Sequence, residues 1–280
     1  MALRFCSFAS GSSGNCYLAK SDTTTILIDV GITGKRVFAG LAEKGIDPAD
    51  LSGILITHEH IDHVRSLRMV ARKAVNARVC ASGGTLGALS DVIEPGKGYT
   101  VRAGEPWDIG DIQVTPFDLS HDAAEPMGFT LQSGGRRLTI VTDTGCISPE
   151  IERHIAAADL LVLEANHEVN ILKMGAYPYS LKRRILGEKG HLSNETAGEI
   201  LCRMLRSPIR HQRVSDGGSQ HVGPGGVPKV VLAHLSKENN TPGQAYLTIR
   251  NILFEEDLYI DKDLTLTIAA RDEAGDFMEV

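Results

Sequence analysis

The 280-residue sequence has no apolar run that approaches the roughly 18–20 residues needed to cross a bilayer. Residues 1–20 show neither a long apolar stretch nor a signal-peptide layout. The five cysteines are odd in number and scattered, and no C-x-x-C pair occurs. These absences argue against a disulfide framework and a membrane partner. They favour reduced thiols in a cytoplasmic protein.

Positive charge is also scarce, since the formal net charge is -6. This balance argues against a nonspecific nucleic-acid binder. The charge is uneven, however, because residues 173–213 carry nine Lys and Arg against three acids. The hydrophobic fraction of 42% and the charged fraction of 23% are ordinary for a soluble globular protein. A chain of this length can bury a core without a disulfide or a structural metal.

Short apolar runs separated by turn residues predict that strands dominate, with helices between them in both halves. Helices are expected at 33–44, where Gly45 ends the pattern, and at 194–205, where Ser193 is a suitable N-cap. Two packed sheets with helices outside, a four-layer αββα sandwich of the α/β class, would satisfy this order.

The C-terminal part of the chain is predicted to end in strands at 258–260 and 264–269. No linker is evident, so we expect a single domain over residues 1–280. The polar, Gly-rich stretch 215–227 is long for a connection inside a compact domain. It predicts a mobile loop at about 207–228.

The motif T-H-E-H-I-D-H at 57–63 directly follows a short apolar run. Neutral imidazole and carboxylate are ligands of zinc and related divalent ions. His58 and His60 are two residues apart, so in an extended segment both project to one side and can bind one ion. Asp62 and His63 follow where the chain would turn, and they are placed to reach a second ion.

Three further candidate ligands, His121, Asp143 and His234, each follow an apolar strand-like run. Such strand ends are where α/β folds display functional groups. A carboxylate such as Asp143 can bridge two ions about 3.5–4 Å apart. The donor set suits Zn²⁺, Mn²⁺ or Fe²⁺, and cellular availability can decide between them. Four other histidines lack this context and are expected to be structural or solvent-exposed: His154, His167, His211 and His221.

Taken in order with Asp29, these residues resemble the motif set of the metallo-β-lactamase fold superfamily over nearly the whole chain. The resemblance implies the αββα sandwich with a two-metal site between the sheet edges. It implies that one ion is held by His58, His60 and His121, and the other by Asp62, His63 and His234. It also implies that Asp143 bridges the ions and that Asp29 orients a ligand by a hydrogen bond.

Two more segments, L-E-A-N-H at 163–167 and G-H-L-S-N-E-T at 190–196, resemble nucleases of the tRNase Z type. The resemblance implies that Glu164 and His191 pair near the leaving group. A carboxylate fixes the orientation of an imidazole, which can then give a proton to the departing oxygen. The alternative is that His191 only precedes the helix that Ser193 caps.

Basic residues between these two segments are candidates for binding adjacent phosphates: Lys182, Arg183, Arg184 and Lys189. Tyr177 and Tyr179 in the same stretch are candidates for stacking on exposed bases. Both features also have an ordinary interpretation, as a solvated helix face and as packing aromatics.

Residues 7–18 and 232–240, together with G-H-L-S-N, are similar to the YycJ/WalJ-type branch of bacterial metallo-β-lactamase-fold nucleases. That resemblance implies a dinuclear-metal phosphodiesterase, a DNA exonuclease acting 5′ to 3′. We hypothesise a water or hydroxide that bridges the ions as nucleophile. Asp62 would take its proton, and His191, oriented by Glu164, would stabilise or protonate the leaving oxygen.

Four alternatives stay open at this stage. A small-molecule cyclic phosphodiesterase would share the metal site and need no basic surface. A thioester or lactam hydrolase would not need His191. An RNA nuclease is a further alternative. A nucleic-acid-binding protein without catalysis would bind after metal removal. The sequence predicts neither the metal nor the oligomeric state.

Overall fold

The computed structural model of the chain describes residues 2–210 and 227–280. By their contacts these residues form two compact units, which are described separately. Unit 1 runs to Asp118 and adds Asp122–Gly134 and Ala270–Glu279, whereas unit 2 holds Leu119–His121, Gly135–Ala269 and Val280. The single domain stays a prediction. Most of the loop predicted at 207–228, with His211 and His221, lies outside the described residues.

Unit 1 contains a seven-stranded sheet with the order β14-β1-β2-β3-β4-β5-β6. The strands are β1 (Arg4–Ala9), β2 (Cys16–Lys20), β3 (Thr25–Ile28), β4 (Gly53–Leu55), β5 (Arg78–Ala81), β6 (Gly98–Thr100) and β14 (Met278–Glu279). Pairing is antiparallel from β14 to β3 and parallel from β3 to β6. An antiparallel meander belongs to the same unit: β7 (Trp107–Ile109), β8 (Ile112–Asp118) and β9 (Met127–Ser133).

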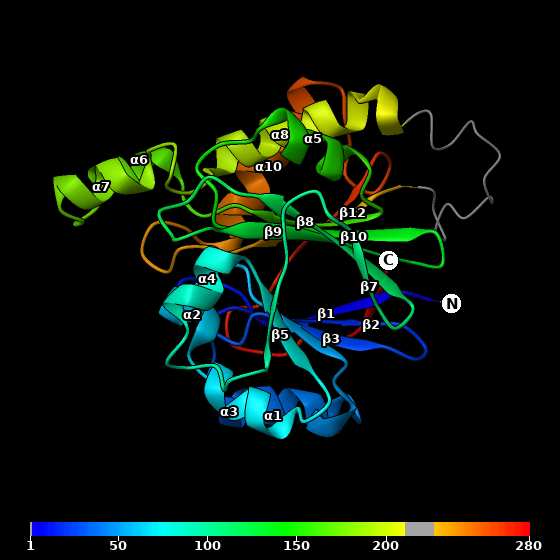
Figure 1. Cartoon of the computed structure of the whole chain (residues 1–280). Helices are drawn as coiled ribbons and strands as arrows, with labels where there is room; N and C mark the ends of the chain where they lie inside the picture. The colour runs from blue at the N-terminus through cyan, green and yellow to red at the C-terminus, as the bar shows by residue number, and fades with distance from the viewer. Residues whose placement is uncertain (1, 211–226) are drawn as a thin grey trace. The chain divides into compact units, whose positions relative to one another are not determined.

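The helices of unit 1 are α1 (Gly34–Glu43), α2 (Ile61–Val64), α3 (Leu67–Lys73), α4 (Gly83–Ala88) and the 3₁₀ helix η1 (Pro48–Asp50). Helices α1 and α3 lie together over one face of the sheet (Figure 1). Their buried residues, such as Leu41 and Val70, share one apolar core with Leu27 of β3 and Ile54 of β4. Because parallel strands end at the same edge, β3 and β4 deliver the residues that follow them to one place.

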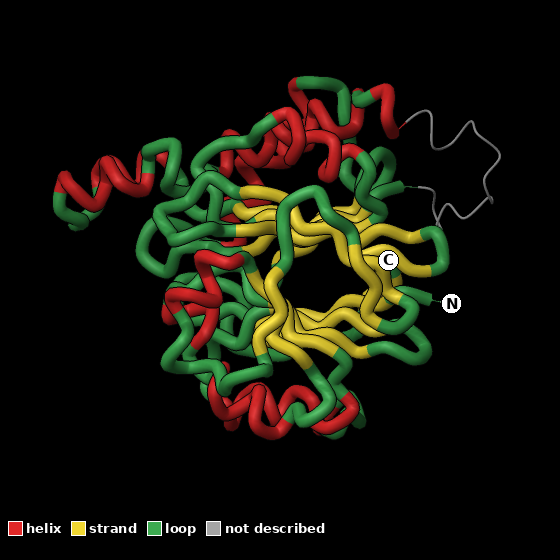
Figure 2. Tube along the Cα trace, viewed as in Figure 1, coloured by secondary structure: helices red, strands yellow, loops and turns green. Residues whose placement is uncertain are grey.

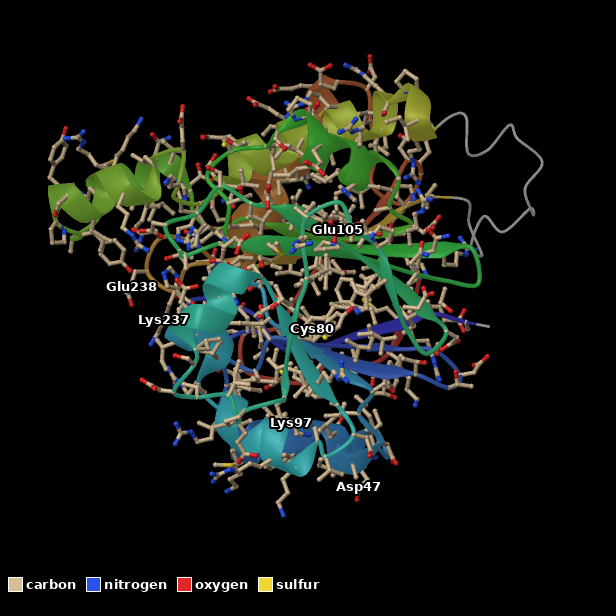
Figure 3. The ribbon with its side chains drawn as sticks, in the orientation of Figure 1. Asp47, Cys80, Lys97, Glu105, Lys237 and Glu238 are labelled. Carbon is tan, nitrogen blue, oxygen red and sulfur yellow. The ribbon has the colours of Figure 1, made fainter. Side chains whose placement is uncertain are left out.

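Polar side chains form hydrogen bonds with backbone groups at the start of η1 and just after α3 in unit 1. Asp47 accepts a hydrogen bond from the Ala49 amide at 2.8 Å and so caps η1 (Figure 3). The Lys97 ammonium, drawn in the same figure, donates to the carbonyls of Ala74, Val75 and Ala77 at 3.2, 2.8 and 3.3 Å. These carbonyls follow α3 and have no helical partner, so the lysine secures the chain after that helix.

Unit 2 is built on four parallel strands, β10 (Arg136–Val141), β11 (Leu160–Glu164), β12 (Lys229–Ala233) and β13 (Thr265–Ile268). Its helices are α5 (Pro149–Ala156), α6 (Val169–Met174), α7 (Tyr179–Ile185), α8 (Asn194–Arg206) and α10 (Pro242–Glu255). Figure 2 shows α5, α8 and α10 gathered over one side of these strands. Each of the three begins at a Ser or Thr whose hydroxyl accepts from an amide of the first turn: Ser148, Ser193 and Thr241.

Two helix predictions and one strand prediction can be compared directly with the structure. The helices expected at 33–44 and 194–205 are confirmed as α1 and α8. The strand expected at 258–260 is wrong, because only an isolated bridge joins Ile260 to Leu264. The Leu258 amide donates to the Leu253 carbonyl at 2.9 Å and ends α10. Asp257, which directly precedes this segment, has a φ of 56° and so interrupts the extended backbone that a strand needs.

Among the described residues, no helix is both long and apolar enough to cross a membrane. All five cysteines are free thiols. Burial raises the pKa of Cys6 to about 11 and that of Cys80 to about 12. Thiols with such values are almost fully protonated at neutral pH and therefore unreactive.

Candidate metal centre

The histidine cluster of unit 1 consists of His58, His60, Asp62 and His63, and it directly follows β4. His58 is fully buried and its Nε2 lies 3.0 Å from His60 Nδ1, with the ring centroids 4.6 Å apart. The ring of His63 is 4.2 Å from that of His58. Imidazole nitrogens grouped in this way can serve as ligands of a divalent metal ion.

Asp29, the residue after β3, holds the cluster in place through hydrogen bonds to Thr57 and His63. It is fully buried and its Oδ1 accepts from the Thr57 amide at 2.9 Å. Its Oδ2 accepts from the Thr57 hydroxyl at 2.9 Å and from His63 Nδ1 at 2.7 Å. The hydrogen bond expected for Asp29 is therefore present. Its importance for a bound metal stays a prediction.

The turn between β1 and β2 also supports the cluster, which the sequence did not indicate. The Asn15 amide nitrogen lies 3.1 Å from His63 Nε2, and the Asn15 backbone donates to the Asp62 carbonyl at 2.8 Å. Gly31 passes so close that a Cβ there would lie 1.6 Å from the Asp62 carbonyl oxygen. The polar G-S-S-G-N turn at 11–15 is visible in the sequence, but its partners Asp62 and His63 are too distant along the chain to be inferred from it.

A second cluster lies within unit 2 and is organised around Glu164, the last residue of β11. Glu164 is fully buried. Its Oε1 accepts from His191 Nδ1 and from His234 Nδ1, both at 2.8 Å. Its Oε2 accepts from the backbone amides of Thr144 at 3.2 Å and Leu192 at 3.1 Å. The structure thus brings Glu164 and His191 together and adds His234 as a second partner.

Asp143 and His121 complete this glutamate cluster (His121, Asp143, Glu164, His191 and His234). Asp143 Oδ1 lies 3.3 Å from His234 Nδ1, 3.7 Å from His191 Nδ1 and 3.9 Å from His121 Nε2. His121 donates from Nδ1 to the Gly190 carbonyl at 3.1 Å. One donor atom each of Asp143, Glu164, His191 and His234 fall within 4.8 Å of one another, close enough for a metal ion.

The charge state of Glu164 follows from these contacts. Burial alone would raise the pKa of Glu164, but the charge of His191 and the hydrogen bonds from His191 and His234 outweigh it. The pKa of Glu164 is therefore held well below its usual value. An ionised carboxylate in this position stabilises positive charge on the imidazoles that it contacts.

Three candidate site residues have left-handed backbone conformations, although none is glycine. The φ angles are 56° at Asp29, 59° at Asp143 and 53° at His234. Such conformations cost roughly 1–3 kcal/mol each and persist only where surrounding contacts hold them. The Asn166 side chain provides one such contact, since it donates to the His234 carbonyl at 2.9 Å. The strained backbone at these three residues aims their side chains in directions that an ordinary conformation would not give.

The donor set fits a divalent metal in one specific respect. Five imidazoles have Nδ1 next to an oxygen that fixes the tautomer: His58, His63, His121, His191 and His234. Carboxylate and carbonyl oxygens can only accept, so Nδ1 carries the hydrogen and Nε2 keeps its lone pair. The Thr57 hydroxyl, which donates to Asp29, likewise accepts from His58. Histidines that bind metal through Nε2 are held in this way.

The structure distinguishes among the predicted phosphate-binding residues. The Lys182 ammonium donates to the carbonyls of Lys173 at 2.8 Å and Gly175 at 2.6 Å, which gives it a structural task. Arg183, Arg184 and Lys189 are exposed. His167 is buried, and burial lowers its pKa to about 4, in keeping with a structural histidine.

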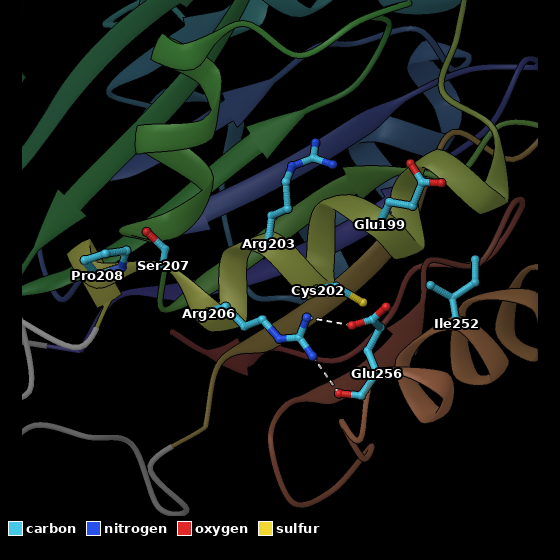
Figure 4. Close-up of a pocket in the computed structure, with 8 residues that line it drawn as sticks. All are labelled: Glu199, Cys202, Arg203, Arg206, Ser207, Pro208, Ile252 and Glu256. Atoms are coloured by element: carbon cyan, nitrogen blue, oxygen red, sulfur yellow. Dashed lines mark hydrogen bonds and ion pairs between the residues drawn. The ribbon is translucent and has the colours of Figure 1, made fainter.

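A pocket in unit 2 lies between α8 and α10 and contains none of the predicted site residues (Figure 4). Its lining residues are Glu199, Cys202, Arg203, Arg206, Ser207, Pro208, Ile252 and Glu256. Arg206 is paired with Glu256 at 2.6 Å, and Arg203 with Glu152 of α5 at 2.7 Å. These pairs offset the positive charge of both arginines.

Comparison with known proteins assigns the chain to a family. A family model described as "Beta-lactamase superfamily domain" matches residues 24–242. The chain is also similar to the metallo-β-lactamase fold protein YhfI from Bacillus subtilis, with a TM-score of 0.71, 14% identity and 100% of both chains covered. The chain belongs to the β-lactamase superfamily and has the metallo-β-lactamase fold, so the predicted fold class is confirmed.

Sequence relatives narrow the assignment. The chain is 35% identical over 259 residues to the exodeoxyribonuclease YycJ of Bacillus anthracis, with 91% of each chain covered. It is 32% identical over 285 residues to the exodeoxyribonuclease WalJ of Streptococcus pneumoniae strain D39, with 100% of this chain and 99% of the relative covered. The predicted similarity to the YycJ/WalJ-type branch is confirmed.

Proposed function

We propose that this chain is a metal-dependent phosphodiesterase that shortens DNA from its 5′ end. The observation that carries the proposal is the set of imidazoles whose Nδ1 is fixed by an oxygen and whose Nε2 keeps its lone pair. Two relatives that match over nearly their whole length are named exodeoxyribonucleases, which supports DNA as the substrate. The free thiols support a cytoplasmic location.

The metal ligands are proposed as the family resemblance implies them. His58, His60 and His121 would hold one ion, and Asp62, His63 and His234 the other, with Asp143 shared. Zn²⁺, Mn²⁺ and Fe²⁺ all suit imidazole and carboxylate donors. When bound, two such ions lower the pKa of water and offset the negative charge of a phosphate.

The chain's own residues then manage the protons. Asp62, with its side chain 21% exposed, is open enough to accept a proton from the attacking water. His191 is 12% exposed and already gives its Nδ1 hydrogen to Glu164. A second proton on His191 Nε2 makes an imidazolium, which the ionised Glu164 stabilises. That Nε2 proton is available to the leaving oxygen.

The test uses full-length protein loaded with Mn²⁺ or Zn²⁺ and duplex DNA labelled at either end, with a chelator control. We expect stepwise shortening from the 5′ end that the chelator abolishes. His60→Ala should abolish turnover while the fold stays intact. His191→Ala should lower turnover more than it lowers metal content. Unchanged activity in either variant would remove that residue from the proposed machinery.

Parallel substrates decide among the alternatives. Cleavage of bis-p-nitrophenyl phosphate alone would favour a small-molecule cyclic phosphodiesterase, and faster cleavage of RNA would favour an RNA nuclease. Thioester or lactam hydrolysis that ignores the loss of His191 would indicate a different hydrolase. DNA binding that survives metal removal, without cleavage, would indicate a binding protein.

A further inference from the structure

The segment 169–189 forms an arm that consists of α6 and α7. Figure 1 shows both helices extending away from α8 of their own unit. The chain enters the arm shortly after Glu164 and leaves it just before His191. The arm contributes no residue to the glutamate cluster, so the metal centre does not explain why it exists.

The exposed surface of the arm is apolar and basic. Met174 is 88% exposed and Tyr179 is 76% exposed, and Ile171 and Leu186 are also exposed. Exposed basic residues lie on the same arm: Lys173, Arg183, Arg184 and Lys189. The only acid in the arm is Glu188. Large apolar side chains and positive charge so close together fit a ligand that has both flat apolar groups and negative charge.

The arm is held in one shape by its own contacts. The Lys182 ammonium of α7 donates to the carbonyls of Lys173 and Gly175, at the end of α6. Leu172 and Ile185 are buried and anchor the two helices. A surface that is ordered before binding loses less conformational entropy when a ligand arrives.

The end of the arm is tied directly to the proposed catalytic histidine. The His191 amide donates to the Ile185 carbonyl at 3.0 Å. Gly190 between them fits so tightly that a Cβ would lie 2.2 Å from the same carbonyl oxygen. A ligand bound along α7 is therefore held at a fixed position relative to His191.

We propose that the arm is a docking platform for single-stranded DNA, an inference that rests on DNA as the substrate proposed above. Tyr179 stacks on an unpaired base, and Arg183 and Lys189 contact neighbouring phosphates. Stacking requires a base whose face is open, which a single strand offers along its length and a duplex offers only at its ends. The arm therefore gives the enzyme a preference for substrates with a single-stranded stretch.

The first experiment measures binding without cleavage. Full-length protein with a chelator is titrated into a fluorescently labelled single-stranded oligonucleotide and into a duplex of equal length, and anisotropy is recorded. We expect the single strand to bind more tightly. Tyr179→Ala should weaken binding of the single strand about tenfold, whereas Tyr179→Phe should bind like the wild type, because stacking needs the ring and not the hydroxyl.

Two further variants separate stacking from charge. Phe254→Ala removes an aromatic ring that is 65% exposed on α10, outside the arm, and should leave binding unchanged. Arg183→Ala should reduce the slope of log affinity against log salt by about 0.7, the value for one phosphate contact on a single strand. Tyr179→Ala should leave that slope as it is. Thermal unfolding and hydrolysis of bis-p-nitrophenyl phosphate check that each variant is folded and intact at the metal centre.

The outcomes distinguish this proposal from the proposed function. If the wild type cleaves DNA but Tyr179→Ala binds the single strand as well as the wild type does, the platform is refuted and the nuclease stands. Equal losses in Tyr179→Ala and Tyr179→Phe, equal losses for duplex and single strand, or a change of oligomeric state in Tyr179→Ala would also refute it. Ring-dependent binding of single strands without any chelator-sensitive cleavage would support the platform and refute the nuclease.

Discussion

Replacement of Glu164 by glutamine tests the proposed centre most directly. The substitution keeps the shape of the side chain but turns one carboxylate oxygen into an NH₂ group. Each Glu164 oxygen accepts two hydrogen bonds, one pair from the imidazoles of His191 and His234 and the other from the amides of Thr144 and Leu192. Whichever way the new amide turns, one pair of donors faces a donor.

The magnitude depends on which pair loses its acceptor. Two unsatisfied backbone amides would lower the free energy of unfolding by about 2–6 kcal/mol, at roughly 1–3 kcal/mol for each buried group. If the NH₂ group faces the imidazoles instead, His191 and His234 can accept at Nδ1 only by moving their hydrogen to Nε2. His234 then loses the lone pair that binds metal, and metal affinity should fall about 10–100-fold. We expect Glu164→Gln to show one of these losses or a share of both.

Two assays cover both routes. Urea unfolding of the chelator-treated protein gives the stability term, and competition with a chromophoric zinc chelator gives the affinity term. The control is Glu188→Gln, which makes the same chemical change at an exposed glutamate of unit 2. Wild-type stability together with wild-type zinc affinity in Glu164→Gln would refute the assignment of Glu164 as the organiser of this cluster.

Two further predictions concern backbone fit and pH. Gly31→Ala should lower the free energy of unfolding by about 1–3 kcal/mol or more, because its Cβ would meet the Asp62 carbonyl. Gly87→Ala has open space around it in α4 and should raise the free energy of unfolding by up to about 1 kcal/mol. Equal stabilities of the two variants in urea titration would contradict this prediction. Burial lowers the pKa of His167 to about 4 from an ordinary 6.5. Between these values the unfolded chain binds a proton that the folded chain excludes. The contribution of the neutral His167 to the free energy of unfolding is therefore complete above pH 6.5 and is lost as the pH falls to about 4. His167→Gln in chelator-treated protein should flatten that part of the stability curve, and an unaltered slope would show that another group is responsible.

The sequence predicted the ligands of the proposed centre because each lies in a short local pattern. His58 and His60 are two residues apart, and Asp143 and His234 each follow an apolar run that forms a buried strand. The supporting contacts could not be found in this way. Asn15 reaches His63 across 48 residues, and Glu164 reaches His234 across 70. Such pairs depend on strand order and register, which local pattern does not encode.

The arm was missed for a different physical reason. Its helices are only six and seven residues long, and each buries a single residue, Leu172 in α6 and Ile185 in α7. Helices this short lack the repeated apolar spacing from which a helix is predicted. Their order comes instead from the tie between Lys182 and the end of α6. Lys182 therefore has a structural contact that the sequence did not indicate, and its role as a phosphate ligand stays a prediction.

The contacts of the glutamate cluster explain how a buried, ionised carboxylate is stabilised at Glu164. A buried carboxylate is expensive unless every lone pair is satisfied and a positive charge lies close by. Glu164 has four donors, and two of them are imidazoles. Its ionised form is therefore stable only while the segments at Thr144, His191 and His234 are in place. The arm returns to the core at one of these segments, through the bond from His191 to Ile185. Displacement of the arm would therefore strain the same hydrogen bonds that set the tautomer of His191. In the proposed mechanism, this would link docking of DNA on the arm to the proton that His191 gives to the leaving oxygen.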